Sequence, residues 1–389
     1  MERGEPIGGG HFAGLRVLGF CDHFTESSSG GAEKVTAEVY SRFCAQGLEV
    51  TVLSAIPGRD AEVVAVRGIP TQVVPALDLA EVLNAQVTLA PRLLGAARRL
   101  IDEFRPQVLH ATSVHFQGSI AAALLAWSRR LPLVTTGHVA SVSQLPPLTQ
   151  AAATAYEQTV GRLILRSSTR VIAVSEAVAA HLRHLGAAAD RVRVVTNGVD
   201  QDRFTPGARD PHRRQVVFVG RLIQNKGPAD ALAAFAALGR PEARLTFVGD
   251  GPMRAELERE VARLGLGGAV CFTGHLDDVA PILGSADVLI RPSRTEGQSL
   301  AILEAMAAGV CVLATDIPAN RELVDDGDSG LLAPVGDTRQ LAAGLARLLD
   351  DGVLRDRLAA QGRQRARQHS WEVCARETGR VLMEAAGDR

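Results

Sequence analysis

Short apolar runs alternate with helical patterns along almost the whole chain, and they form two series. The first series opens with LRVLGF at 15–20, and the second opens with QVVFVGRL at 215–222. Runs that end in glycine or polar residues and are followed by helical patterns are typical of strands in parallel sheets. The chain is therefore expected to be α/β, with two doubly wound, Rossmann-like domains. The other expected strands are LEVTVLS, PQVLHATS, LPLVTTGH, TRVIAVS and VRVVTNG in the first series and ARLTFVGDG, AVCFTGH, ADVLIRPS and VCVLATD in the second.

A polar, proline-containing stretch separates the two series and is the expected linker. This stretch is DQDRFTPGARDPHRR at 200–214. We therefore expect a first domain over 1–204 and a second domain over 205–369, and 389 residues suit two domains. In doubly wound sheets, ligands bind at the carboxyl ends of the strands. If the two domains face each other, the site is expected in the cleft.

Composition excludes several classes of protein. A net charge of −1 argues against a nucleic-acid surface. Five scattered cysteines without a CxxC motif suit a reducing cytosol and argue against disulfides or a zinc knuckle. The chain has no apolar run long enough to span a membrane, and its start, MERGEPIGGG, does not resemble a signal peptide. A cytoplasmic location is expected.

The segment PSRTEGQSLAILEAMAAG at 292–309 is the most informative for function. Its turn-like beginning carries Glu296, and its apolar helical part carries Glu304 among residues that should face the core. A buried carboxylate is costly without a partner. The helix start between the two glutamates is a ready-made site for an anion.

Only two of the 42 basic residues are lysines, and Lys226 lies in a glycine-containing loop after the first strand of the second domain. Gly220 and Arg221 end that strand. Together, Arg221 and Lys226 suit a diphosphate, because arginine offers a planar fork of donors and lysine a point charge. The alternative is a pair of solvated loop cations. Gly251, after the next strand, either lets the backbone approach a ligand or forms an ordinary turn.

The first domain offers weaker candidates. Gly31 precedes a helix, where backbone N–H groups can meet a phosphate or sugar, although an ordinary β–α turn would look the same. His138 and His110 each end an expected strand, and a structural role remains open for both. The DxD pattern at Asp200 and Asp202 lies in the linker, so no metal site is expected.

The motifs together resemble the retaining GT-B glycosyltransferases of glycosyltransferase family 4. The resemblance covers the chain from about residue 15 to the final helix, and the two glutamates in their extended context are its most specific part. Gln298, Ser299 and Cys311 depart from the family's common residues, which leaves the donor's identity open. The matching pieces are GGAE (30–33), VTNGVD (195–200), GRLIQNKG (220–227), VGDGPMR (248–254), FTG (272–274), the segment 286–309 and NRELVDDGDSGLLAPVGD (320–337).

The resemblance implies roles for individual residues. Arg221 and Lys226 would hold the donor diphosphate, Glu304 the ribose and Glu296 the hydroxyls of the donor sugar. Backbone amides of Gln298, Ser299 and Leu300 would face the phosphate and sugar. Gly31 would approach the donor from the first domain, and His138 would lie near the transferred sugar. A final helix at about 370–389 would pack back on the first domain.

The reaction implied is metal-independent transfer of a hexose or N-acetylhexosamine from a nucleoside-diphosphate sugar, with a UDP-sugar favoured. The donor is a co-substrate, so no cofactor is expected. A small polar acceptor such as a cyclitol or a secondary-metabolite precursor is favoured. Peripheral membrane contact through 92–105 is not favoured, and the oligomeric state stays open. The alternatives are a lipid- or polysaccharide-directed transferase, a sugar-nucleotide 2-epimerase, and a non-catalytic binding protein.

Overall fold

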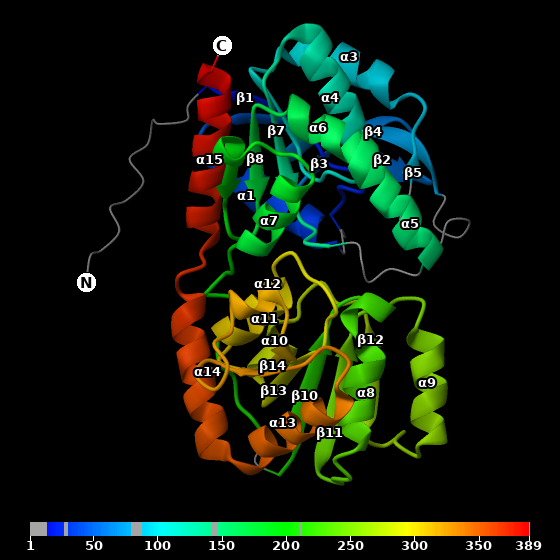
Figure 1. The fold of residues 1–389 in the computed structure, drawn as a ribbon, viewed down its shortest axis with the longest axis vertical. Helices are drawn as coiled ribbons and strands as arrows, with labels where there is room; N and C mark the ends of the chain where they lie inside the picture. Colours follow the sequence, from blue (N-terminus) through cyan, green and yellow to red (C-terminus); the bar gives the residue numbers. More distant parts are fainter. Residues whose placement is uncertain (1–13, 27–29, 79–87, 142–146, 211, 389) are drawn as a thin grey trace, which may run out of the picture. The chain divides into compact units, whose positions relative to one another are not determined.

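The computed structural model describes residues 14–26, 30–78, 88–141, 147–210 and 212–388. The chain divides into two compact units, which we call unit 1 (Met1–Thr196 with Trp371–Arg389) and unit 2 (Asn197–Ser370). Each unit contains one sheet with helices on its faces (Figure 1). The first residues of the chain, on which the expectation about a signal peptide rests, lie outside the described residues.

The boundary between the units lies between Thr196 and Asn197, before the expected boundary at 204/205. The residues between these two positions pack within unit 2. Val199 pairs with Ser370, and Phe204 is buried in a core cluster of unit 2. The stretch expected to be a linker, 200–214, is therefore partly core, because its Phe204 is buried.

The sheet of unit 1 has the strand order β3-β4-β2-β1-β6-β7-β8-β9, with β5 beside β4. Its neighbours are parallel except for the pairs β3–β4 and β4–β5. These three strands were not predicted, and they add an antiparallel edge to the expected parallel sheet. The strands are β1 (Arg16–Phe20), β2 (Glu49–Pro57), β3 (Glu62–Val66), β4 (Ile69–Asp78), β5 (Thr88–Leu89), β6 (Val108–Ala111), β7 (Leu133–Gly137), β8 (Arg170–Ala173) and β9 (Val192–Val194).

The helices of unit 1 include the last helix of the chain. This helix, α15, packs against α1, and Arg42 of α1 forms an ion pair of 2.9 Å with Glu372. A short π-helix, Glu157–Gly161, joins α5 to α6. The α-helices are α1 (Gly31–Ala45), α3 (Leu93–Phe104), α4 (Gln117–Arg129), α5 (Pro147–Tyr156), α6 (Arg162–Ser167), α7 (Glu176–His184) and α15 (Trp371–Gly387).

The sheet of unit 2 is parallel throughout, with the strand order β12-β11-β10-β13-β14-β15. The unpredicted strand β15 extends it at one edge. Its strands are β10 (Arg214–Val219), β11 (Ala243–Val248), β12 (Val270–Gly274), β13 (Val288–Arg291), β14 (Cys311–Thr315) and β15 (Leu331–Ala333). Its helices are α8 (Pro228–Ala236), α9 (Arg254–Arg263), α10 (Ala280–Gly284), α11 (Leu300–Ala307), α12 (Pro318–Arg321), α13 (Thr338–Asp350) and α14 (Gly352–Ala366).

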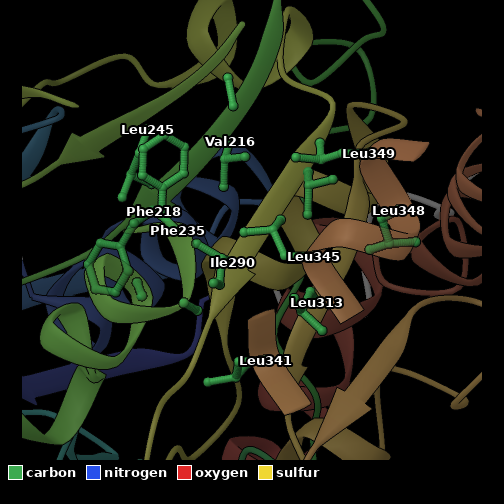
Figure 2. Packing of buried hydrophobic residues seen from close by; sticks show 14 of the residues in the cluster. Val216, Phe218, Phe235, Leu245, Ile290, Leu313, Leu341, Leu345, Leu348 and Leu349 are labelled. Atoms are coloured by element: carbon green, nitrogen blue, oxygen red, sulfur yellow. The ribbon is translucent and has the colours of Figure 1, made fainter. Parts of the chain in front are cut away.

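Alternate residues of each strand in unit 2 enter two different cores, because side chains alternate across a sheet. Phe218 of β10 and Ile290 of β13 belong to a core with α8, α9, α13 and α14. Figure 2 shows Leu345 of α13 beside Ile290. Val217 and Leu289 point the other way, toward α10 and α11. Burial on both faces explains why these strands are continuously apolar in the sequence.

Candidate functional site

The ends of three adjacent strands in unit 2 come close together. Gly220 follows β10, Gly249 follows β11 and Arg291 ends β13. A Cβ atom on Gly249 would lie 2.1 Å from the Gly220 carbonyl oxygen, and one on Gly220 would lie 2.4 Å from an Arg291 nitrogen. Both glycines also have positive φ angles, +143° and +135°. These two positions require glycine so that the strand ends and the arginine fit together.

Arg291 is buried at this edge of the sheet. Its Nη1 donates to the carbonyl oxygen of Val219 at 2.6 Å, and its guanidinium lies over the ring of Phe218. Its Nε and Nη2 donate to Oε1 of Glu296 at 3.1 and 2.7 Å. The side chains of Arg291 and Glu296 are each 6% exposed, so the pair is almost completely desolvated. A buried ion pair of this kind needs further hydrogen bonds to hold it.

Two more residues supply those hydrogen bonds to Glu296. Ser293 donates its hydroxyl to Oε1 at 2.7 Å, and Lys226 donates its ammonium to Oε2 at 2.6 Å. We call Lys226, Arg291, Ser293 and Glu296 the charge network. Burial alone would raise the pKa of Glu296, but attraction to Lys226 and Arg291 and these hydrogen bonds lower it to about 2. The carboxylate is therefore ionised and fixed in position.

The segment that carries Glu296 leads directly into α11. Ser299 is the N-cap of this helix, and its hydroxyl accepts from the backbone N–H of Ile302. Leu300 is the first helical residue, and Glu304 lies further along the helix, 5% exposed. The side-chain oxygen of Gln298 accepts from the Asn197 backbone N–H at 2.6 Å. The glutamates thus lie on the two sides of a helix start in unit 2.

Arg221 and Gly251 complete this edge of unit 2. Arg221 directly follows Gly220 and is exposed. Gly251 has a φ of +156°, and a Cβ atom there would lie 2.6 Å from the Leu222 carbonyl oxygen. Gly251 is therefore required by the packing of the two loops, whether or not a ligand approaches it.

Lys226 is positioned by the loop that follows Leu222. A short 3-10 turn, Gln224–Lys226, ends at Gly227, which has a φ of +69°. The backbone N–H groups of Lys226 and Gly227 donate to carbonyl oxygens earlier in the same loop. The loop therefore turns the Lys226 side chain toward Glu296, 70 residues away in the sequence.

The candidates of unit 1 have different surroundings. Gly31 is the first residue of α1, and a Cβ atom there would meet no heavy atom within 4 Å. His138 follows β7 and is half-buried; burial lowers its pKa to about 4, partly offset by a hydrogen bond with the Thr112 backbone. Its imidazole is therefore neutral near pH 7.

His110, the weaker histidine candidate, is part of the core. Its Nδ1 is 2.8 Å from the hydroxyl of Tyr40, and its Nε2 is 2.8 Å from that of Thr136. Burial, with a small contribution from His138, lowers its pKa to about 3. Both nitrogens are thus used within the fold, which indicates a structural role.

Sequence reasoning identified Lys226, Glu296, Ser299 and Glu304 as candidates but missed Arg291 and Ser293. Arg291 ends the run ADVLIRPS, which was interpreted only as a strand. An arginine at the end of an otherwise apolar strand could have indicated this role, because a buried cation requires an anionic partner nearby.

The described residues contain neither a cluster suited to a metal ion nor a helix suited to span a membrane. In this part of the chain, no group of three or more histidine, cysteine, aspartate and glutamate side chains is placed to hold a metal ion. Among the described helices, none combines the length and apolar character needed to cross a membrane.

Family models match both units of the chain. "Glycosyltransferase Family 4" matches residues 29–203 and "Glycosyl transferases group 1" matches residues 200–365. A glycogen synthase of Mycobacterium tuberculosis is 30% identical over 290 residues, 72% of this chain and 70% of that protein. The chain belongs to glycosyltransferase family 4, the group 1 glycosyltransferases, and it is a glycosyltransferase.

Two further relatives have names that state other activities. A phosphatidyl-myo-inositol mannosyltransferase of Mycolicibacterium smegmatis is 31% identical over 316 residues, 78% of each chain. A 2-deoxystreptamine glucosyltransferase of Streptomyces kanamyceticus is 31% identical over 253 residues, 60% of this chain and 64% of that protein.

Solved structures show that the fold is GT-B. Sucrose-phosphate synthase from Thermosynechococcus elongatus has a TM-score of 0.81 at 24% identity, covering 95% of this chain and 98% of that one. HepE from Anabaena, in complex with UDP-glucose, has a TM-score of 0.76 at 20% identity, covering 95% and 100%. At these identities the likeness concerns the fold alone, and it agrees with the expected pair of Rossmann-like domains.

Proposed function

We propose that the enzyme transfers a hexose or N-acetylhexosamine from a UDP-sugar to a hydroxyl of a small polar acceptor, with retention of configuration. One observation carries the proposal: the charge network holds Lys226 and Glu296 together beside the capped start of α11. An ammonium, a fixed carboxylate and a helix start are the groups that a sugar joined to a diphosphate would require.

Each group has a distinct task in this proposal. Lys226, Arg221 and the backbone N–H groups at the start of α11 stabilise the negative charge that develops on the β-phosphate as the nucleotide leaves. Charge preorganised in this way is usually the largest catalytic contribution. Glu296 accepts hydrogen bonds from donor-sugar hydroxyls, and Glu304 accepts them from the ribose.

The surroundings of Glu296 favour same-face attack over a double displacement. A double displacement needs a carboxylate that can attack the anomeric carbon. The oxygens of Glu296 already accept from Arg291, Ser293 and Lys226, and its pKa is about 2, so it is a weak nucleophile. In same-face attack, the acceptor oxygen bonds to the anomeric carbon as the bond to the β-phosphate breaks, and the phosphate takes the acceptor's proton.

The relatives support the choice of donor and acceptor. HepE was solved with UDP-glucose, which favours a uridine nucleotide. One relative acts on 2-deoxystreptamine, a small aminocyclitol, and its name states that it transfers glucose. Unit 2 supplies the diphosphate site in this proposal, and unit 1 supplies the acceptor site.

The stereochemistry of the product tests the proposal. Purified enzyme is incubated with a panel of UDP-, GDP- and ADP-sugars and a panel of small polyols, and the product is analysed by mass spectrometry and proton NMR. We expect transfer from a UDP-sugar with the anomeric configuration of the donor. A product with the inverted configuration would contradict both retaining mechanisms. Conversion of the donor sugar without any acceptor would instead indicate an epimerase.

A lipid acceptor is a second candidate, because one specific observation favours it. Trp127 and Leu124 lie one turn apart on α4 and are 81% and 47% exposed, next to Arg129 and Arg130. An exposed tryptophan beside arginines suits an anionic membrane surface, and one relative mannosylates phosphatidyl-myo-inositol. Flotation with vesicles that contain phosphatidylserine tests this candidate. The Trp127→Ala variant should lose vesicle binding if the candidate is right.

A further inference from the structure

The two carboxylate oxygens of Glu296 have unequal surroundings. Oε1 accepts three hydrogen bonds, from Nε and Nη2 of Arg291 at 3.1 and 2.7 Å and from the Ser293 hydroxyl at 2.7 Å. Among the described residues, Oε2 accepts from Nζ of Lys226 alone, at 2.6 Å. A carboxylate offers about four lone-pair sites, or about two on each oxygen. Oε1 is therefore saturated, whereas Oε2 can accept one more hydrogen bond.

The partners of Oε1 lie deeper in unit 2 than the partner of Oε2. The side chain of Arg291 is 6% exposed, and Ser293 is fully buried. The side chain of Lys226 is 18% exposed. This difference indicates that Oε1 faces the sheet and that Oε2 faces the side from which a ligand can approach.

Arg291 is itself held by the end of β10. Its Nη1 donates to the Val219 carbonyl oxygen at 2.6 Å, and its guanidinium lies 5.6 Å from the centroid of the Phe218 ring. Gly220 leaves room for it, because a Cβ atom there would lie 2.4 Å from Nη1. The donors of a guanidinium lie in one rigid plane. The end of β10 therefore determines where Oε1 is held.

The loop between β13 and α11 is anchored from two further sides. The carbonyl oxygen of Ser293 accepts from the hydroxyl of Thr315, which ends β14. The backbone N–H of Arg294 donates to the carbonyl oxygen of Asn225 at 2.9 Å, next to Lys226. These backbone contacts place the partners of the carboxylate without its help.

We propose that Arg291 is a positioning residue of the donor site: it holds Oε1 of Glu296, so that Oε2 alone meets the donor sugar and accepts from one of its hydroxyl groups. The inference rests on the proposed function, since it concerns the sugar that the donor carries. Arg291 does not touch the donor. A carboxylate with both oxygens free could accept from two neighbouring hydroxyls, whereas Glu296 recognises a single one.

Deoxy analogues of the donor test this role. The active UDP-sugar of the donor panel and its 3-, 4- and 6-deoxy analogues are titrated into the full chain without acceptor, and binding is measured by calorimetry. One analogue should bind the native enzyme about 10-fold more weakly or worse, the loss expected for a hydrogen bond to a charged group. The other hydroxyls do not meet Glu296 in this proposal, so their removal reports other contacts.

The same titrations with Arg291→Lys measure the coupling between Arg291 and that hydroxyl. A lysine keeps a cation but replaces the rigid fork by a single point donor, so it cannot hold Oε1 with two bonds. Removal of the sensitive hydroxyl should therefore cost much less in the variant than in the native enzyme. Equal losses in both proteins for every analogue would overturn the inference. Coupling at two positions would also overturn it, because both oxygens would then bind the sugar.

Arg355 provides a matched structural control. It is a second buried arginine of unit 2, 6% exposed, and its Nε lies 3.7 Å from Oδ1 of Asp287. Asp287 accepts from the Gln215 backbone N–H near the start of β10, at the opposite edge of the sheet. Arg355→Lys should lower the melting temperature but keep the native donor kcat/KM and the native pattern of losses. Arg291→Lys should lower donor kcat/KM about 10-fold and leave the affinity for UDP, which lacks the sugar, unchanged.

Ser293→Ala reaches the same oxygen without removing a charge. It deletes one of the three donors to Oε1, and it should weaken the coupling less than Arg291→Lys does. This variant keeps the test decisive if Arg291→Lys does not fold. Native donor binding with no coupling in either variant would overturn only the role of Arg291. A native chain that binds neither UDP nor a UDP-sugar would contradict the proposed function itself.

Discussion

The carboxyl edges of the two sheets differ in the charge state of their buried side chains. In unit 2, the buried carboxylate of Glu296 pairs with Arg291 and Lys226, which help to lower its pKa to about 2. In unit 1, His110 and His138 are neutral, with pKa values lowered to about 3 and about 4 by burial. Similar folds therefore place different electrostatics at the same edge of the sheet. In the proposed function, unit 2 binds the diphosphate of the donor and unit 1 binds the acceptor.

The largest effect is expected from breaking the charge network at its centre. Arg291→Met leaves Glu296 buried with one cation fewer, and breaking a buried ion pair costs about 3–5 kcal/mol. Chemical denaturation should show a fall of that order in the free energy of unfolding. The triple variant Lys226→Met/Arg291→Met/Glu296→Leu should be more stable than Arg291→Met alone, since it removes all three charges of the network. If Arg291→Met is as stable as the native protein, the network does not hold the strand ends together.

Removal of the lysine separates catalysis from stability. In Lys226→Ala, Glu296 keeps Arg291 and Ser293, so the fold should persist while the leaving group loses a cation. Loss of one preorganised group of this kind lowers kcat about 10²–10³-fold. Steady-state kinetics measure this. Arg263→Ala, which removes an exposed cation on α9 paired with Glu260, is the matched control and should be fully active. Full activity of Lys226→Ala would contradict the donor-site assignment.

As the pH falls, unit 1 should begin to lose stability at a higher pH than the pH at which Glu296 of unit 2 becomes protonated. His110 and His138 have folded pKa values below the ordinary 6.5, so their contribution is complete above pH 6.5 and is lost as the pH falls through the folded values. Asp22 opposes this, because burial raises its pKa to about 6. His110, His138 and Asp22 together give a slope of about 1.4 kcal/mol per pH unit between pH 6 and 4, that of one histidine, and His23, whose pKa is also lowered by burial, adds to it.

The two tryptophans, Trp127 and Trp371, both belong to unit 1, so their fluorescence reports its unfolding. Denaturation followed by fluorescence at pH 7, 6, 5 and 4 measures the slope. The contribution of Glu296 to unit 2 should persist to pH 4.5 and be lost toward pH 2, since its folded pKa is lowered. A His110→Asn variant with unchanged pH dependence would show that His110 does not contribute.

The smallest effect compares two candidate glycines. Gly31 has open space around its Cβ position, whereas Gly251 faces the Leu222 carbonyl oxygen. The Gly31→Ala variant should therefore have the melting temperature of the native protein. If the donor approaches this backbone, the added methyl group should obstruct it and raise the donor KM several-fold. Gly251→Ala should lose stability, since its φ disfavours a side chain. Unchanged donor KM in Gly31→Ala would remove Gly31 from the donor site.

Sequence patterns predicted the parallel strands well and the irregular parts poorly. The second series of runs corresponds to β10–β14, because strands buried on both faces are continuously apolar. Strands β3 and β4 were missed because β3 is half-exposed and β4 contains two prolines. The packing of Phe204 in the core of unit 2 was missed because it is an isolated apolar residue in the polar stretch 200–214.

The sequence by itself determined the order of strands and helices and the segment that places Glu296 and Glu304 at a helix start. Both follow from local patterns, namely apolar periodicity and capping. Only the tertiary structure decided which charges meet. Lys226 lies 70 residues from Glu296 and Arg291 only five, and parallel strand ends bring all three together. Likewise, packing of β6, α7 and the π-helix, not any motif, brings His115 and His181 to one oxygen of Glu157.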